Sequence, residues 1–325
     1  MKYTSLLTIL VSFYNAEEHI VACIKNLKAQ TNANFYCILV DDGSTDKSNE
    51  YAADEIKDDN RFSLTCHEQN LGLGAGRETG IRNTRTEYLT FIDVDDKLEA
   101  DAVEKILHAI RTQEADLYVF DYFIKNEQNE VRLISGDAKS ALEMFLTNDS
   151  RISHVWHKAY KTSLFSNLDF SFYRTISFAE DLYICIHCFM NSRKTILISD
   201  AYYYYIYNEK SLVHCRTEKS IHENIAVIRK ILAQENLKQF PEIESYIKND
   251  SFYACGQLIF PNKKNPFQWN SPHFDEWRSI NAEREIFIPV KTHPLVRLYI
   301  TLIKVGRNHT AKIVWNILKL REKAK

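Results

Sequence analysis

The chain of 325 residues is poor in glycine, proline and methionine, with eight, six and three of each. It also lacks any run that approaches the ~20 apolar residues needed to cross a bilayer, so we predict no membrane-spanning helix. The formal net charge of −2 argues against a general nucleic-acid binder. Ordinary fractions of hydrophobic (45%) and charged (26%) residues exclude disordered and collagen-like classes. A chain of this length and composition is expected to form about two globular domains.

The seven cysteines share no spacing typical of a disulfide framework, which suits a reducing compartment. Cys185 and Cys188 form a single C-x-x-C pair, a pattern found in redox and zinc sites, but no second pair follows. Apolar neighbours at helical spacing predict instead that both pack in a core. The short apolar run near the N-terminus has no small-residue cleavage site, which favours a buried first strand over a signal peptide. We therefore expect a cytoplasmic protein.

Charge is distributed unevenly along the chain. Residues 290–325 hold nine Lys or Arg and one Glu, a balance of +8, and the rest of the chain carries −10. Apolar stripes at helical spacing accompany these basic residues. Such helices can lie on an anionic membrane surface, which would place the protein at the inner face of the cell membrane. They can equally pack on the body of the protein or on a second subunit of a homo-oligomer.

Strands and helices alternate from the N-terminus. Apolar runs predict strands at residues 7–13, 35–40, 62–66 and 88–92, and helical spacing or a cap-like Ser-Thr pair predicts helices at 16–29, from 44, and at 74–84. This order predicts an α/β fold with a mostly parallel sheet covered by helices on both faces. From about residue 216 helical spacing dominates without strands. We therefore predict a catalytic domain over 1–215 and a helical add-on domain over 216–325.

Polar loops follow three of the predicted strands, at residues 12–15, 41–46 and 93–96. Ligands bind beyond the carboxyl ends of the strands in such sheets, so these loops are expected to line one crevice. Five of the eight glycines lie between residues 43 and 80, where we expect tight turns or close approach to a ligand. The glycines at 72, 74 and 76 follow the third strand, whereas a dinucleotide fingerprint follows the first, so a dinucleotide site is disfavoured.

Six short motifs occur in order along the first two thirds of the chain. They are VSFYN at 11–15, VDDGSTD at 40–46, NLGLGAGRETG at 70–80, FIDVDD at 91–96, WHK at 156–158 and ED at 180–181. Together they resemble the inverting nucleotide-sugar glycosyltransferases of the GT-A fold, the large family that builds bacterial polysaccharides. The resemblance covers residues 5–215. It implies metal-dependent transfer of a hexose from a UDP-sugar to a hydroxyl of a growing capsule, wall polymer, lipid-linked repeat or surface glycoprotein.

The first three motifs are expected to bind the nucleotide. Asp42, at a strand end, can accept a charge-assisted hydrogen bond from a uracil ring N–H. The resemblance implies that Ser12 and Tyr14 frame the base and ribose and that Arg77 faces the nucleotide. Ser12 and Glu78 depart from the family pattern, which has Pro and Asn there. The alternative is a turn leading to a capped helix, which does not explain two adjacent carboxylates after an apolar strand.

The aspartates of FIDVDD are expected to hold a metal. Alternate residues of an extended segment point the same way, so Asp93 and Asp95 present two carboxylates together. Hard cations such as Mn²⁺ or Mg²⁺ take oxygen ligands and neutralise the charge of a leaving diphosphate. The resemblance implies that Asp95 is the direct ligand and that Asp93 contacts the sugar or a metal-bound water. Asp96 is either part of this site or the cap of a helix over 98–110.

Inversion requires a base that takes the proton of the acceptor hydroxyl. The resemblance implies that Asp181 is this base and that Glu180 orients it. It also implies that Trp156 and Lys158 wall the sugar pocket, and that His214 closes over the diphosphate and completes the metal shell. The alternatives are carboxylates that complement a helix dipole, a core tryptophan and a structural histidine.

Two other functions fit parts of this pattern. A nucleotidyltransferase that makes NDP-sugars uses a related sheet, but it carries a glycine- and arginine-rich loop near its first strand, where this chain has VSFYN. A degenerate nucleotide-sugar-binding module would keep the crevice without the chemistry. The presence of Asp42, Asp93, Asp95 and Asp181 together argues against such a module.

Overall fold

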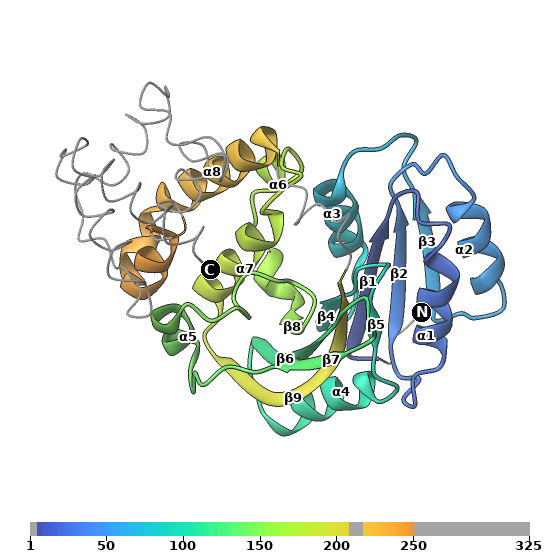
Figure 1. The fold of residues 1–325 in the computed structure, drawn as a ribbon, viewed down its shortest axis with the longest axis horizontal. Helices are drawn as coiled ribbons and strands as arrows, with labels where there is room; N and C mark the ends of the chain where they lie inside the picture. The colour runs from blue at the N-terminus through green and yellow to red at the C-terminus, as the bar shows by residue number, and fades with distance from the viewer. Residues whose placement is uncertain (1–4, 208–216, 249, 251–325) are drawn as a thin grey trace, which may run out of the picture. The chain divides into compact units, whose positions relative to one another are not determined.

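The computed structural model describes residues 5–207, 217–248 and 250. The chain divides into two compact units, Met1–Ile243 and Glu244–Lys325, and the first contains every strand of the described part. His214 and the basic segment at 290–325 lie outside the described residues. Within the described part, nine strands form one sheet, in the order β3-β2-β1-β4-β8-β6-β9-β5 with β7 paired to β6 (Figure 1).

The first half of the sheet is parallel, as predicted. The central strand β1 pairs with β2 on one side and β4 on the other, and β2 pairs with β3. Almost every residue of β1, β2 and β4 is buried, as expected for parallel strands covered on both faces, whereas β3 at the edge of the sheet is only partly buried. The elements are β1 (Leu7–Phe13), α1 (Ile20–Lys28), β2 (Tyr36–Asp41), α2 (Ser48–Ile56), β3 (Phe62–Cys66), α3 (Leu73–Asn83) and β4 (Tyr88–Phe91).

The second half of the sheet is mixed. Strand β8 is antiparallel to both β4 and β6, while the long curved β9, the yellow arc in Figure 1, is parallel to β6 and antiparallel to β5. The predicted α/β class is thus confirmed, with parallel pairing concentrated in β1–β4. The elements are β5 (Lys97–Leu98), α4 (Ala102–Thr112), β6 (Leu117–Lys125), β7 (Val131–Ile134), α5 (Ala141–Thr147), β8 (Lys158–Lys161), the 3₁₀ helix Thr162–Phe165, α6 (Phe170–Tyr173), α7 (Glu180–Asn191), β9 (Thr195–Ile206), α8 (Glu218–Leu232) and the 3₁₀ helix Glu235–Gln239.

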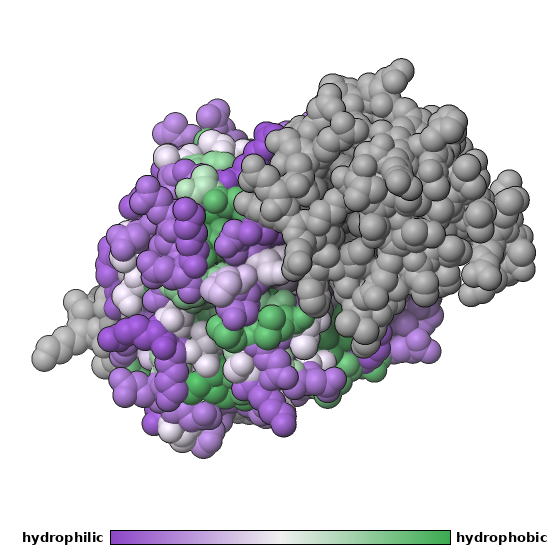
Figure 2. Space-filling model, turned by 90° about the vertical axis from the view of Figure 1, so that its left-hand side faces the viewer, coloured by the Kyte–Doolittle hydropathy of each residue, from purple (hydrophilic) through white to green (hydrophobic). Residues whose placement is uncertain are grey.

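Aromatic side chains fill much of the core between these elements. The described surface is mainly hydrophilic on the face that Figure 2 shows, with hydrophobic residues in smaller areas. Tyrosine suits such a core where its hydroxyl finds a partner, as those of Tyr118, Tyr160 and Tyr203 do. The largest fully buried side chains include Tyr118, Tyr160, Tyr173, Tyr183, Tyr202 and Tyr203.

Glycines of α3 serve packing rather than ligand approach. A Cβ on Gly76 would lie 2.0 Å from Ser12 Oγ, and a Cβ on Gly80 would lie 2.3 Å from Leu10 Cδ1. Both contacts are with β1, so these glycines let the helix lie close against the sheet. The expectation of a tight turn is met at Gly43, whose φ is +71°.

The predicted cap of the second helix is wrong. Helix α2 begins at Ser48, and Ser44 Oγ instead accepts the backbone N–H of Asn15 at 3.0 Å. Thr45 N–H donates in return to Asn15 Oδ1 at 2.9 Å. Short polar side chains bind nearby backbone as readily as they cap helices, and here they join the loops after β1 and β2.

Helix α7 contains the C-x-x-C pair. Cys185 and Cys188 are both fully buried, and burial raises the pKa of the Cys185 thiol to about 11, so both are core residues as predicted. Helix α8 packs on α7 and begins with a reciprocal cap between Thr217 and Ser220. The domain boundary near residue 216 stays a prediction. No helix in the described part of the chain is long and apolar enough to span a bilayer.

Candidate active site

Arg77 lies at the centre of the predicted site. Its guanidinium, on α3, is 3% exposed and is 3.2 Å from Asp93 Oδ1, beyond the end of β4. It is also 3.2 Å from Glu180 Oε1 on α7 and donates to Asp181 Oδ1. Carboxylates from two distant motifs, Asp93 and the adjacent pair Glu180 and Asp181, therefore meet on one cation.

One guanidinium does not neutralise this cluster. Burial, with the negative charge of Asp181 adding to it, raises the pKa of Glu180 to about 8, although Arg77 opposes the shift. Burial also raises the pKa of Asp93 to about 6, again against Arg77, with Asp181 and Asp95 reinforcing the rise. The cluster around Arg77 thus holds surplus negative charge, which favours binding of a cation or uptake of protons.

Glu180 is expected to make the stability of the protein depend on pH. Its pKa is about 8 in the folded state against an ordinary 4.5, so the folded state keeps a proton that the unfolded chain releases. The free energy of unfolding should therefore fall as the pH rises through this window. Thermal unfolding at pH 6 and pH 8 should show this loss in the wild type and a smaller loss in Glu180→Gln. Glu78→Gln, which changes another buried glutamate, should keep the wild-type loss; an equal loss in all three would contradict this assignment.

The three aspartates after β4 have different environments. Asp95 is exposed, and its carboxylate has no hydrogen-bond partner among the described residues. Asp93 keeps 34% of its side chain exposed. Asp96 is buried and accepts hydrogen bonds from Tyr203 Oη at 2.6 Å and from the Ile206 N–H at 2.7 Å. Asp96 is therefore an anchor for β9.

The alternative of Asp96 as a helix cap is wrong, because α4 begins at Ala102 with Asp101 at its cap position. Tyr203 was missed by the sequence reasoning. Its hydroxyl, besides donating to Asp96, accepts the backbone N–H of Asp93 at 3.1 Å and so fixes the turn that carries the two predicted metal ligands. The tyrosine-rich run of β9 was the only signal, and it does not show which tyrosine faces the turn.

The donor set of this turn fits a hard divalent cation. The described residues contain no group of three or more His, Cys, Asp or Glu side chains that could hold a metal ion. Mg²⁺-type sites, however, take one or two protein carboxylates and complete their shell with substrate phosphates and water. Asp95, exposed and without a partner among the described residues, and Asp93 beside it supply those two carboxylates. The roles of Asp93, Asp95 and His214 at a metal stay predictions.

Asp42 is held by the loop that precedes α3. Its carboxylate accepts the backbone N–H groups of Gly72 at 2.7 Å and Leu71 at 2.9 Å, and it lies 2.7 Å from His67 Nδ1. Asp42 is 2% exposed, and three of roughly four acceptor positions of its carboxylate are used within the protein. Its contact with uracil stays a prediction. His67 was not anticipated; its Nε2 lies 2.8 Å from Thr79 Oγ1, so it ties Asp42 to α3.

The other two residues predicted to frame the nucleotide lie at the end of β1. Ser12 Oγ is buried without a hydrogen-bond partner among the described residues, and Tyr14 is 44% exposed. Tyr14 is open to a ligand at this edge, whereas Ser12 Oγ is buried, and the role of both residues stays a prediction.

Trp156 and Lys158 are buried in the packing of the protein. Trp156 is 4% exposed, and its ring is nearly parallel to those of His154, Tyr203 and Tyr205, with centroids 4.9, 4.5 and 5.7 Å away. Lys158 is fully buried, and its ammonium group donates to backbone carbonyls. The alternative of core packing describes Trp156 in this structure, and the predicted contacts of both side chains with a sugar stay untested.

The part of the chain that carries these residues matches a known protein family. The model of "Glycosyl transferase family 2" matches residues 8–197, which is more than half of the chain. The chain belongs to glycosyl transferase family 2. The predicted enzyme class is thereby confirmed: the protein is a glycosyltransferase.

Two relatives of this glycosyltransferase come from bacteria. It is 31% identical over 230 residues to the glycosyltransferase GlyA of Streptococcus pneumoniae, which covers 66% of this chain and 32% of GlyA, so the chain spans about a third of that relative. It is 30% identical over 268 residues to EpsH of Bacillus subtilis, which is named as a glycosyltransferase, covering 79% of this chain and 76% of EpsH.

Solved structures share the fold of this glycosyltransferase at low identity. The S. aureus TarS fragment 1–349, in complex with UDP-GlcNAc, has a TM-score of 0.69 at 17% identity and covers 95% of this chain and 91% of that one. The mannosyltransferase PcManGT of Pyrobaculum calidifontis, in complex with GDP-Man and Mn²⁺, has a TM-score of 0.55 at 13% identity, over 98% and 85%. These likenesses confirm the GT-A type of fold.

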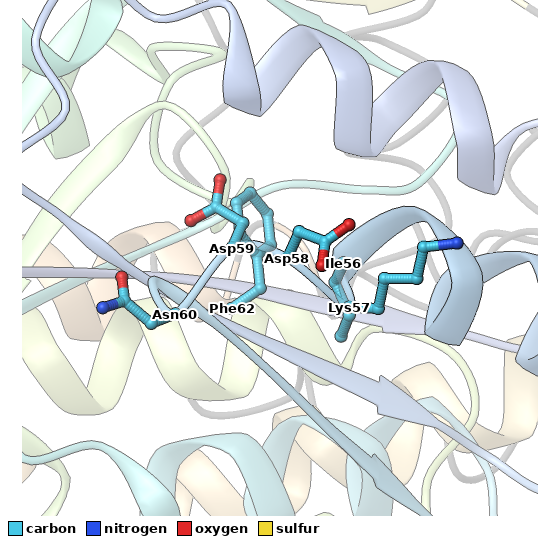
Figure 3. Close-up of a pocket in the computed structure, with 6 residues that line it drawn as sticks. All are labelled: Ile56, Lys57, Asp58, Asp59, Asn60 and Phe62. Atoms are coloured by element: carbon cyan, nitrogen blue, oxygen red, sulfur yellow. The ribbon is translucent and has the colours of Figure 1, made fainter.

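A separate hollow lies away from the crevice of this glycosyltransferase. It is an open depression between the end of α2 and the start of β3 (Figure 3), lined by Ile56, Lys57, Asp58, Asp59, Asn60 and Phe62. This is the amino end of β3, whereas the site residues follow the carboxyl ends of β1, β2 and β4. The hollow therefore takes no part in the predicted active site.

Proposed function

We propose that this glycosyltransferase moves a hexose from a UDP-sugar to a hydroxyl of a growing glycan, with inversion at the anomeric carbon and with Mn²⁺ or Mg²⁺. One observation carries the proposal: Arg77 contacts both Asp93, at the predicted metal turn, and Asp181, the predicted base. The residues proposed to stabilise the leaving diphosphate and the residue proposed to deprotonate the acceptor hydroxyl would thus lie around the same arginine.

The proposed reaction gives a separate role to the base, to the metal ligands and to the residue that binds the nucleotide base. Asp181 would take the proton of the acceptor hydroxyl while the oxygen attacks the anomeric carbon from the face opposite the diphosphate. Its Oδ2 accepts the Val155 N–H at 3.3 Å, which holds the carboxylate in place. Asp95 and Asp93 would hold the metal, which when bound neutralises the developing charge of the diphosphate. Asp42 would select the base by accepting its ring N–H.

The nearest experimental support for a nucleotide-sugar donor comes from proteins of the same fold. TarS was solved with UDP-GlcNAc and PcManGT with GDP-Man and Mn²⁺. Association of residues 290–325 with an anionic membrane surface or with a second subunit is part of this proposal, and selection of the sugar and the acceptor would depend on the region after residue 96 and on the C-terminal add-on.

A panel of nucleotide sugars tests the proposal. We expect UDP-glucose, UDP-galactose or UDP-N-acetylglucosamine, with Mn²⁺, to raise the melting temperature, because a ligand at about 100 times its Kd adds about 2.7 kcal/mol of stability. The same donor should release UDP slowly, and EDTA should abolish both effects. GDP-sugars serve as the matched comparison. Absence of any nucleotide effect, with no influence of chelator, would reject the proposal, and release of pyrophosphate from UTP and a sugar phosphate would favour a nucleotidyltransferase.

A further inference from the structure

The peptide group between His154 and Val155 connects a buried lysine to Asp181. On one side of this group, the Val155 N–H donates to Asp181 Oδ2 at 3.3 Å. On the other side, the His154 carbonyl accepts a hydrogen bond from Lys158 Nζ. The two contacts are therefore the two ends of one amide unit.

The geometry of the amide transmits one contact to the other. A trans peptide is planar, so its C=O and N–H point in opposite directions, and fixing the carbonyl fixes the direction of the N–H. The described residues contain no cis peptide bond. A cation on the oxygen also polarises the amide, which strengthens its N–H as a donor in a surrounding of low dielectric. Lys158 thus influences both the direction of the Val155 N–H and its strength as a hydrogen-bond donor to Asp181.

The other protons of Lys158 are engaged within the protein as well. Its Nζ lies 2.5 Å from Arg151 O and 3.2 Å from His157 Nε2. His157 Nδ1, 2.8 Å from Phe120 O, faces a group that only accepts, so Nδ1 carries the hydrogen and Nε2 is free to accept from the ammonium. With three donors used and no exposed surface, Lys158 has none left for a donor sugar.

The pKa of Lys158 reflects both its burial and its nearness to the carboxylate of Asp181. Burial lowers the pKa of Lys158 to about 8, and the negative charge of Asp181 is among the groups that oppose this shift. Tyr160 holds the same segment from the next peptide, since its hydroxyl donates to Val155 O at 3.1 Å.

We propose that Lys158 is a positioning residue for Asp181, acting through the His154–Val155 peptide group, rather than a contact of the donor sugar. The proposal rests on the role of Asp181 as the base in the proposed function. Arg77 would hold Oδ1 of that carboxylate while the peptide group holds Oδ2.

Lys158→Met removes the ammonium group and keeps an unbranched apolar side chain for the buried space. We expect the turnover number for UDP release to fall about tenfold to a hundredfold, as for a misplaced catalytic group. The KM for the donor and the Kd for UDP should stay within about twofold, since neither depends on the base. Lys161→Met is the matched control, because Lys161 is on the same strand and pairs with Glu87 and Asp116 instead. A rise in donor KM or UDP Kd with an unchanged turnover number would overturn the proposal.

An Asp181→Asn background separates positioning of the base from a general structural effect. If Lys158 acts through Asp181, adding Lys158→Met to Asp181→Asn should change the residual rate less than about twofold. An equal loss in both backgrounds would overturn the proposal. Tyr160→Phe, which removes the hydroxyl that holds the neighbouring peptide at Val155 O, tests the positioning of this segment should Lys158→Met fail to fold: a lower turnover number at constant KM supports the proposal, and wild-type behaviour overturns it. A wild-type protein that neither binds nor releases UDP would overturn the proposed function itself, which these same assays reveal.

Discussion

Replacing Asp181 by Asn is expected to lower the turnover number about 10²–10⁴-fold, the usual contribution of a general base, while UDP binds with a Kd within about twofold of the wild type. Asparagine has the shape of aspartate but cannot take up the proton of a hydroxyl. Asparagine has one oxygen for the two donors that Asp181 receives, so it can accept either the Val155 N–H or Arg77. Arg77 keeps Asp93 and Glu180 as partners. Initial rates of UDP release and calorimetric titration with UDP provide the two measurements.

Glu180 is the competing candidate for the base. It contacts the same guanidinium at 3.2 Å, and its raised pKa of about 8 suits proton uptake near neutral pH. Glu180→Gln should therefore be measured beside Asp181→Asn, with Asp169→Asn as a control, since Asp169 pairs with Lys230 outside the crevice. A larger loss in Glu180→Gln than in Asp181→Asn would reverse our assignment, and a loss of UDP binding in Asp181→Asn would place that residue at the nucleotide.

The parallel half of the fold was predictable from the sequence because its signals are local. The predicted bounds of β1 and β3 match the observed ones, since β1 is a largely apolar run and β3 is a short segment between Arg61 and His67. The mixed half was not predictable in the same way. Strand β8 was interpreted only as part of a site motif, and the pairing of β9 with both β6 and β5 depends on tertiary contacts that no periodicity encodes.

The site likewise contains residues that local motifs predict and contacts that depend on the tertiary structure. Asp93, Glu180 and Asp181 were predicted and do meet on Arg77, because each belongs to a motif at an element end. Contacts made by backbone, such as the Val155 N–H, carry no side-chain signal and could not be predicted. The full burial of Lys158 was not foreseen, because lysine is almost never fully buried and the resemblance placed this residue in the wall of the sugar pocket.

Replacing Asp95 by Ala is expected to remove the metal dependence of the enzyme without destabilising it. The exposed carboxylate has no partner among the described residues, so its loss leaves no buried group unpaired. A metal contributes several kcal/mol to neutralising a leaving diphosphate, which corresponds to a turnover number lower by about a hundredfold or more. Titration with Mn²⁺ in the presence of UDP should no longer raise the melting temperature, and EDTA should no longer reduce the residual rate.

Asp96→Asn is the matched control, since Asp96 is adjacent in sequence but differs in environment. Its two oxygens accept from Tyr203 Oη and from the Ile206 N–H, and asparagine has only one oxygen for the two donors. Leaving one buried donor unpaired costs about 1–3 kcal/mol, so this variant should melt earlier than the wild type and still respond to Mn²⁺. The opposite result is an Asp96→Asn variant that is stable and loses its response to Mn²⁺ while Asp95→Ala retains it. This result would assign the metal ligand to Asp96. That outcome would contradict the division of the turn into an exposed metal ligand and a buried anchor.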